Sequence, residues 1–207
     1  MLNILDYYLP DIQLLENESK RFLIWIPDKL YVVLGASNKA DDALFVENIK
    51  RDNVLVLKRP SGGQTVLLTP NNLIISVAFY NVKSIQPKEV FNQINELIIS
   101  ALEQAGIENL NLSGISDIAI LNKKILGSSI YRSKNTLLYH AVLNMGEPAT
   151  TFEKYLKHPT KEPEYRKGRS HSDFVTSLME SGYSMSYKQL ETVINKVFEN
   201  HVVESNN

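Results

Sequence analysis

Short apolar runs, rich in β-branched residues, recur along the chain between polar turns. Most of these runs are nearly continuous rather than alternating, which is typical of strands covered on both faces. The pattern predicts five strands, at Tyr31–Leu34, Asn53–Leu57, Asn72–Phe79, Asp117–Leu121 and Thr136–Leu143.

Other stretches repeat their apolar residues at helical spacing. Helices are predicted at Pro87–Gln104, Tyr187–Glu199 and, in a shorter form, Asp173–Met179. Pro87 suits a first helical position and Gly106 suits a stop, while Ser186 and Gln189 form a capping-box pattern. Strand runs separated by isolated helices favour an α+β fold over regular βαβ alternation.

The length of 207 residues and the 43% apolar content suit one domain over residues 1–207, with a frayed tail at 204–207. A stretch rich in charges and turn residues predicts a long loop at 160–172. The chain has no cysteine, which excludes disulfides, thiolate metal sites and a cysteine nucleophile within it.

The net charge, the N-terminal residues and the lengths of the apolar runs exclude further classes of protein. With 22 basic and 23 acidic residues the net charge is −1, so binding to nucleic acid is not expected. Residues 1–9 carry no basic residue, unlike a secretory signal, and no apolar run reaches the ~20 residues of a membrane helix. We therefore expect a cytoplasmic protein with no membrane partner.

The stretch Lys58–Val66, with the sequence KRPSGGQTV, lies between two apolar runs and carries the most specific chemistry. Gly62 and Gly63 permit a tight backbone turn whose N–H groups can bind an anion, and Arg59 adds a permanently charged fork for phosphate or carboxylate. The alternative is a hairpin turn with two solvated charges. The pattern is not a P-loop, because it lacks the Gly-Lys-Ser/Thr ending.

A second polar cluster follows the predicted strand that begins at Asp117. Lys124 is expected to start the returning strand, where its ammonium can neutralise developing negative charge, although most such lysines are ordinary surface residues. His140 lies alone in an apolar strand, so a satisfied core histidine is the simpler interpretation, and no metal site is expected. The basic stretch Tyr165–His171 suits a solvated loop better than a contact with an acidic partner.

Taken in order, the segments KRPSGGQTVLLTPNNLIIS, SDIAILNKKILGSSIYR and LLYHAVLN resemble the lipoate–protein ligase A, octanoyltransferase and biotin ligase family. The resemblance spans roughly residues 31–180. It implies a mixed β-sheet with packed helices, as in the catalytic domains of biotin–lipoate ligases and class II aminoacyl-tRNA synthetases, and an apolar tunnel for an acyl chain.

The resemblance also implies an activity. Lipoate, or octanoate, is activated by ATP with Mg²⁺ to an acyl-adenylate and passed to a lysine of a lipoyl-carrier domain, such as a 2-oxoacid dehydrogenase E2 or a glycine-cleavage H-type protein. It implies Lys124 as the catalytic residue, held against the acyl-adenylate carbonyl. The substrate- and nucleotide-binding residues it implies are Arg59, Ser61, Gly62, Gly63, Asn72, Asp117, Gly127, Ser128, Ser129 and His140.

Several positions depart from the family pattern: Lys58 for arginine, Gln64 and Asn71 for glycines, Leu68 for histidine and Ser129 for alanine. These departures leave two alternatives open. One is a transferase without cysteine that uses a preformed acyl donor, and the other is a ligase-like binding protein that has lost catalysis. Only about 25 residues follow Gly182, so a separate accessory ligase subunit is a further expected partner.

Overall fold

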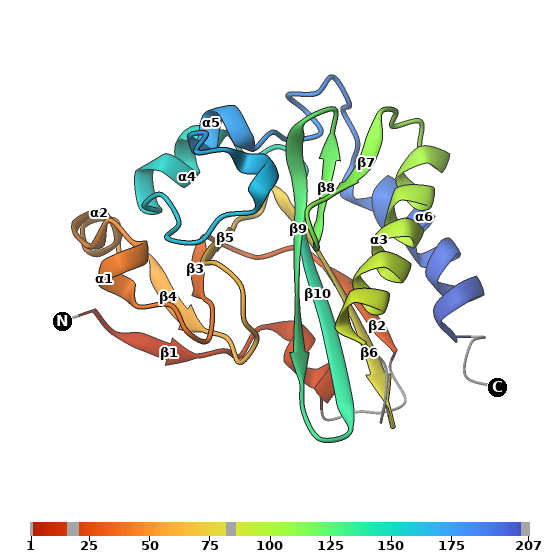
Figure 1. Cartoon of the computed structure of the whole chain (residues 1–207), viewed down its shortest axis with the longest axis horizontal. Coiled ribbons are helices and arrows are strands. Elements are labelled where there is room, and N and C mark those ends of the chain that lie inside the picture. Colours follow the sequence, from red (N-terminus) through yellow and green to blue (C-terminus); the bar gives the residue numbers. More distant parts are fainter. Residues whose placement is uncertain (1, 16–20, 82–85, 204–207) are drawn as a thin grey trace.

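The computed structural model describes residues 2–15, 21–81 and 86–203, so the tail predicted at 204–207 lies outside it. Two β-sheets and a set of helices form the molecule (Figure 1). The larger sheet lies between the smaller sheet on one side and two long helices on the other. This mixture of antiparallel and mixed sheets with packed helices is the predicted α+β class.

The larger sheet is antiparallel throughout, in the order β2-β6-β10-β9-β8-β7. Its strands are β2 (Phe22–Trp25), β6 (Asn72–Tyr80), β7 (Leu110–Ser113), β8 (Asp117–Ile120), β9 (Lys123–Arg132) and β10 (Thr136–Asn144). In the register of β9 and β10, Ser129 lies opposite His140, which brings two sequence-predicted site residues together. A register shift between Ile118 and Ala119 lets Lys124 pair opposite Ala119.

The smaller sheet has the order β1-β4-β3-β5 and mixes parallel and antiparallel pairs. Its strands are β1 (Ile4–Asp6), β3 (Tyr31–Leu34), β4 (Leu55–Lys58) and β5 (Val66–Leu68). Residues of β3 and β5 pack with Ile74 of β6 in one buried cluster, so this sheet covers part of the larger one. That packing explains why the strands read as continuous apolar runs.

Helices cover the remaining faces. They are α1 (Ala40–Ala43), α2 (Val46–Arg51), α3 (Pro87–Gln104), α4 (Ala149–Tyr155), α5 (His171–Phe174) and α6 (Tyr187–Phe198), with 3₁₀ turns η1 (Pro10–Leu15) and η2 (Glu164–Arg166). The apolar faces of α3 and α6 pack on the larger sheet in the main core. Residues Ile94, Ile98, Leu190 and Phe198 of these helices are fully buried there.

Most predicted elements are confirmed within one or two residues. The strand predicted at Asn53 begins at Leu55, because Asn53 adopts a left-handed turn conformation with φ of 51°. The helix predicted at Asp173–Met179 is wrong: α5 ends at Phe174 and Val175 pairs with Lys124 of β9. The Thr176 N–H donates to the Lys124 carbonyl at 2.9 Å, so pairing with a strand replaces the local helical preference.

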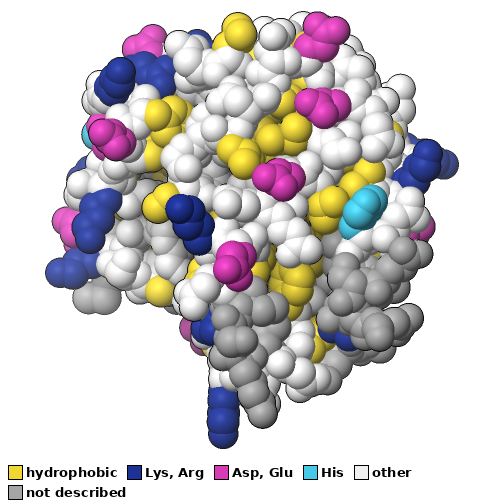
Figure 2. All heavy atoms as spheres, turned by 45° about the vertical axis from the view of Figure 1, so that its right-hand side comes forward, with side chains coloured by type: hydrophobic (Ala, Val, Ile, Leu, Met, Phe, Trp, Pro, Cys, Tyr) yellow, Lys and Arg dark blue, Asp and Glu magenta, His cyan; other side chains and the backbone are white. Residues whose placement is uncertain are grey.

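Within the described ranges, no helix is both long and apolar enough to cross a bilayer. On the face shown in Figure 2, hydrophobic side chains form separate patches among charged and polar ones rather than a continuous band.

Candidate active site

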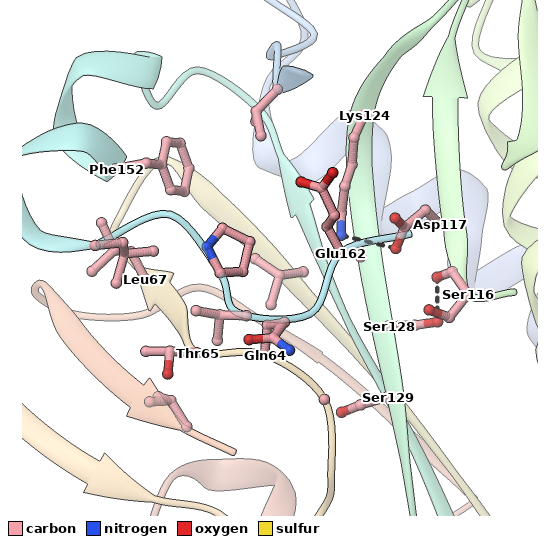
Figure 3. Close-up of a pocket in the computed structure, with 18 of the residues that line it drawn as sticks. Gln64, Thr65, Leu67, Ser116, Asp117, Lys124, Ser128, Ser129, Phe152 and Glu162 are labelled. Carbon is pink, nitrogen blue, oxygen red and sulfur yellow. Dashed lines mark hydrogen bonds and ion pairs between the residues drawn. The ribbon is translucent and has the colours of Figure 1, made fainter. Parts of the chain in front are cut away.

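A cavity of about 870 Å³ is lined by both sheets and by the segment that runs from α4 to α5. One part of its wall is apolar and comes from β3, β5, β6, α4 and the residue after it: Val33, Leu67, Leu68, Ile74, Phe152 and Leu156. Another part carries charged and hydroxyl groups from the β8–β9 region. Figure 3 shows these two parts on opposite sides, with Phe152 and Leu67 facing the strand that bears Lys124. This volume is typical of small-molecule sites.

An ion pair lies at the polar wall. The Lys124 Nζ is 2.8 Å from Asp117 Oδ1, and the Asp117 side chain is only 7% exposed. The Tyr165 hydroxyl donates to the other carboxylate oxygen, Oδ2, at 2.8 Å. Burial, together with the charge of Asp117, raises the pKa of Tyr165, so its proton stays in this hydrogen bond.

Gly127 explains how the lysine fits against its own strand. A methyl group at this position would lie 2.5 Å from Lys124 Nζ and 2.6 Å from Cε. The lysine side chain therefore folds back over the glycine, where a larger residue would displace it. Glu162 also lines the cavity, but its carboxylate accepts from the Gly168 N–H at 2.7 Å and lies 2.9 Å from His158 Nε2.

The glycine-rich turn is held by close backbone approach. Gly63 adopts φ of 87°, a left-handed conformation that favours glycine, and it lines the cavity. Its carbonyl oxygen would lie 2.1 Å from a methyl group on Gly35, so the two loops touch through glycine backbone. The Ala36 N–H donates to the Ser61 carbonyl at 2.9 Å, and the Asn38 Oδ1 accepts from the Thr65 hydroxyl at 3.1 Å.

Arg59 does not present the free fork that the sequence predicts. Its guanidinium is buried and donates inward at 2.8–3.1 Å, to the Ser61 hydroxyl and to the carbonyls of Val33, Gly62 and Gln64. Burial lowers its pKa to about 10, which leaves it cationic at neutral pH. Arg59 organises the glycine-rich turn from behind, because its donors are directed at protein oxygens.

A buried polar chain supports the same turn. The Ser61 Oγ lies 2.6 Å from His140 Nε2 and 3.3 Å from Ser129 Oγ, and His140 Nδ1 lies 3.4 Å from Asp11 Oδ2. Asp11 is fully buried and also accepts from the hydroxyls of Tyr7, at 2.7 Å, and Ser76, at 2.9 Å. His140 is thus a satisfied residue of the larger sheet that also lines the cavity.

Nine of the eleven sequence-predicted site residues line this one cavity: Arg59, Gly63, Asn72, Asp117, Lys124, Gly127, Ser128, Ser129 and His140. Ser61 and Gly62 belong to the same turn but do not line it. The Ser128 hydroxyl is already used, because it donates to the Ser116 carbonyl at 2.7 Å (Figure 3). The buried Nδ2 of Asn72 has no hydrogen-bond partner among the described residues.

Sequence reasoning missed Asp11, Tyr165 and Glu162. Asp11 precedes the strand pattern in a segment without a clear motif, and the other two lie in the stretch expected to be a long loop. The loop predicted at 160–172 ends at 170, where α5 follows; residues 157–170 supply part of the cavity wall, and we call them the covering loop. Within the basic stretch, Arg166 is buried and stacks on Phe174, so the expectation of a solvated loop is wrong there.

The acidic side chains at the cavity do not form a metal-binding cluster of their own. Among the described residues, no group of three or more His, Asp or Glu side chains is placed to hold a metal ion. Mg²⁺ commonly binds through one or two carboxylates together with substrate phosphates. Asp117 and Glu162 line the cavity but are already bonded, Asp117 to Lys124 and Tyr165 and Glu162 to His158 and the Gly168 N–H, so they do not form an all-protein magnesium site.

The catalytic-domain model for lipoyl protein ligases A and B matches residues 5–199, nearly the whole chain. The chain belongs to this family. It is 21% identical over 187 residues to lipoate-protein ligase LplJ of Bacillus subtilis, covering 90% of this chain and 54% of that relative. It is 27% identical over 188 residues to lipoate-protein ligase A of Psychrobacter cryohalolentis, with 89% and 52% covered. This chain therefore spans about half the length of these two relatives.

The family relatives differ in activity. An inactive lipoate–protein ligase 2 of Plasmodium falciparum is 26% identical, with 78% of this chain and 51% of that relative covered. Octanoyltransferase LipM of Clostridioides difficile is 25% identical, with 71% and 60% covered.

Solved structures confirm the predicted fold. The bi-partite lipoate protein ligase of Thermoplasma acidophilum, described with its E2 lipoyl domain, matches with a TM-score of 0.76 at 18% identity, covering 88% of this chain and 71% of that one. A lipoate-protein ligase A bound with ATP matches at 0.75 and 18%, with 90% and 76% covered. The biotin protein ligase of Aquifex aeolicus matches more distantly, at 0.52 and 17%, with 83% and 68% covered.

Proposed function

We propose that this chain activates lipoate, or octanoate, with ATP and transfers the acyl group to a lysine of a lipoyl-carrier domain. The observation that carries the proposal is the Lys124 ammonium, which lies in a cavity whose opposite wall is apolar. An activated acyl group needs both features, because its chain is apolar while negative charge develops at its carbonyl oxygen and phosphate.

In this proposal Lys124 stabilises the charge that develops during both half-reactions. Its ammonium is accessible to a ligand, since 28% of the side chain is exposed, and its partner at the cavity wall is Asp117. The apolar residues Leu67, Ile74 and Phe152 accept the acyl chain and exclude water from it. Mg²⁺ would enter together with the nucleotide and would neutralise the charge of its phosphates.

Two likenesses support the choice of nucleotide and acceptor. One solved relative in fold is described with ATP, and another is described with an E2 lipoyl domain. The cavity, at about 870 Å³, is large enough for a nucleotide and a medium-length acyl chain together. A separate accessory subunit and a glycine-cleavage H-type acceptor remain part of the proposal.

The test is the mass of an apo lipoyl-carrier domain after incubation with this protein, Mg²⁺, lipoate and ATP. The expected result is a gain of one lipoyl group that requires ATP and is lost in Lys124→Ala. The matched control is Lys188→Ala, because Lys188 is exposed on α6 and does not line the cavity. Transfer that persists unchanged in Lys124→Ala would contradict the assignment.

A second candidate is transfer from a preformed acyl donor without ATP. The inward-directed Arg59 favours it, because this guanidinium is not available to bind a nucleotide phosphate. The relatives also include an octanoyltransferase and an inactive ligase. Synthetic lipoyl-adenylate separates the candidates. Modification of the carrier by the adenylate, but not by lipoate with ATP, indicates a transferase, modification under both conditions indicates a ligase, and binding without modification indicates lost catalysis.

A further inference from the structure

We propose that Tyr165 is a positioning residue for Lys124, acting through Asp117. The effect of Tyr165 on catalysis rests on the proposed function. Its effect on the position of Lys124 follows from the hydrogen bonds alone. Tyr165 belongs to the covering loop, whereas Asp117 and Lys124 belong to the β8–β9 hairpin, so the contact joins two separate parts of the cavity wall.

Asp117 is held at both carboxylate oxygens. Lys124 Nζ lies 2.8 Å from Oδ1, and the Tyr165 hydroxyl donates to Oδ2 at 2.8 Å. A carboxylate with a partner on each oxygen has one favoured orientation. Without the hydroxyl, the carboxylate can rotate and the ammonium has no fixed partner atom.

The Tyr165 ring is itself fixed. The ring packs on Phe174 with ring centroids 5.0 Å apart. The backbone carbonyl of Tyr165 accepts a hydrogen bond from the Arg169 guanidinium at 3.0 Å. Gly114, in the turn before β8, leaves room for the ring because it has no side chain. A methyl group at this position would lie only 3.3 Å from the Tyr165 ring. A rigid ring places its hydroxyl accurately, which is what a positioning group requires.

Other bonds attach the covering loop and the segment after it to the hairpin. Arg169 donates to the Asn122 carbonyl at 3.0 Å, and Lys123 donates to the Ser172 carbonyl at 3.0 Å. Thr176 adds a backbone bond to Lys124 at 2.9 Å. Removing only the Tyr165 hydroxyl therefore leaves the loop attached and isolates the effect on the carboxylate.

The experiment measures the reactivity of Lys124 directly. Native protein is labelled with a trace of acetic anhydride, and peptide mass spectrometry compares Lys124 with the exposed Lys188 of α6. Tyr165→Phe should raise the relative labelling of Lys124 several-fold, because its nitrogen is held against the carboxylate for less of the time and the free amine, which is the form that attacks the anhydride, is then available more often. Asp117→Ala should give the highest labelling, and adding Tyr165→Phe to it should change nothing more.

The matched control is Tyr187→Phe, which removes another tyrosine hydroxyl that donates to a carboxylate, that of Glu191 at 2.6 Å, outside the cavity. It should leave Lys124 labelling unchanged. With synthetic lipoyl-adenylate as donor, Tyr165→Phe should also lower kcat roughly tenfold or more while KM for the carrier stays the same, since it displaces a catalytic group and not the acceptor.

Two results overturn the proposal: Tyr165→Phe labels like the wild type, or it raises labelling equally in the Asp117→Ala background. Either shows that Tyr165 does not act through Asp117. The labelling does not depend on turnover. If the wild type transfers no acyl group but the labelling order holds, the proposed function fails and the positioning role stands.

Discussion

Gly35→Ala is expected to damage the cavity from a position that does not line it. The added methyl group would lie 2.1 Å from the Gly63 carbonyl oxygen, against the 3.0 Å below which real Cβ contacts essentially never fall. The turn must therefore move by about 0.9 Å. That movement lengthens the hydrogen bond from the Ala36 N–H to the Ser61 carbonyl, now 2.9 Å, because backbone cannot turn aside as a flexible side chain does.

The stability cost follows from this overlap. Overpacking of this kind costs about 1–3 kcal/mol. For a chain of this size, 2 kcal/mol lowers Tm by roughly 4–8 °C, which differential scanning calorimetry resolves. Acyl transfer should fall much further, on the order of 100-fold, because the turn at the cavity wall is misplaced by nearly 1 Å.

Gly62→Ala is the matched stability control, since nothing lies within 4 Å of a methyl group there. It should leave Tm unchanged or slightly higher. The reasoning is refuted if Gly35→Ala has the Tm of the wild type, or if both glycine variants lose the same stability.

Three further predictions concern single side chains. Gly127→Ala should change Tm little but reduce acyl transfer, because the methyl group, 2.5 Å from Lys124 Nζ, displaces the flexible end of the lysine. A large drop in Tm, or an unchanged transfer rate, would contradict this. Arg59→Lys should lower the free energy of unfolding by roughly 2–3 kcal/mol, measured by urea denaturation, because lysine cannot make four inward hydrogen bonds; a neutral result would refute the structural role. Burial beside Arg166 and His158 lowers the pKa of His171 from 6.5 to about 4. Between these pH values the unfolded chain binds a proton that the folded chain does not, so stability falls as pH drops from 6.5 towards 4. His171→Asn should flatten that part of the Tm–pH curve, and an unchanged slope would exclude His171 as its source.

The elements that carry a strong periodic pattern were predictable from sequence. The long helix α3 begins and ends where Pro87 and Gly106 place it, and the strands β3, β6 and β10 follow continuous apolar runs. The short strands β1, β2, β5 and β7 were not predicted: each contains exposed or half-buried positions, whereas the equally short β3 is buried along its whole length. Their neighbours, not their composition, make them strands.

The candidate site divides in the same way. The family resemblance predicted that Lys124, Asp117 and Gly63 belong to one site. The structure places all three on the wall of one cavity. The direction of the Arg59 side chain was not predictable, since a cation beside a glycine-rich turn can face either a ligand or the turn itself. Tyr165 was hidden because its partner lies 48 residues away, and no local spacing encodes that contact.

The cavity wall is assembled from segments distributed between Tyr7 and Val175, and no single stretch of chain encloses it. Such a site exists only while both sheets are docked, so global unfolding abolishes it. A molecule that fits it must then stabilise the entire fold, by RT ln(1 + [L]/Kd), and not one loop. Melting the chain in the presence of candidate acyl compounds, nucleotides or their mixed anhydrides therefore ranks them by affinity without any turnover.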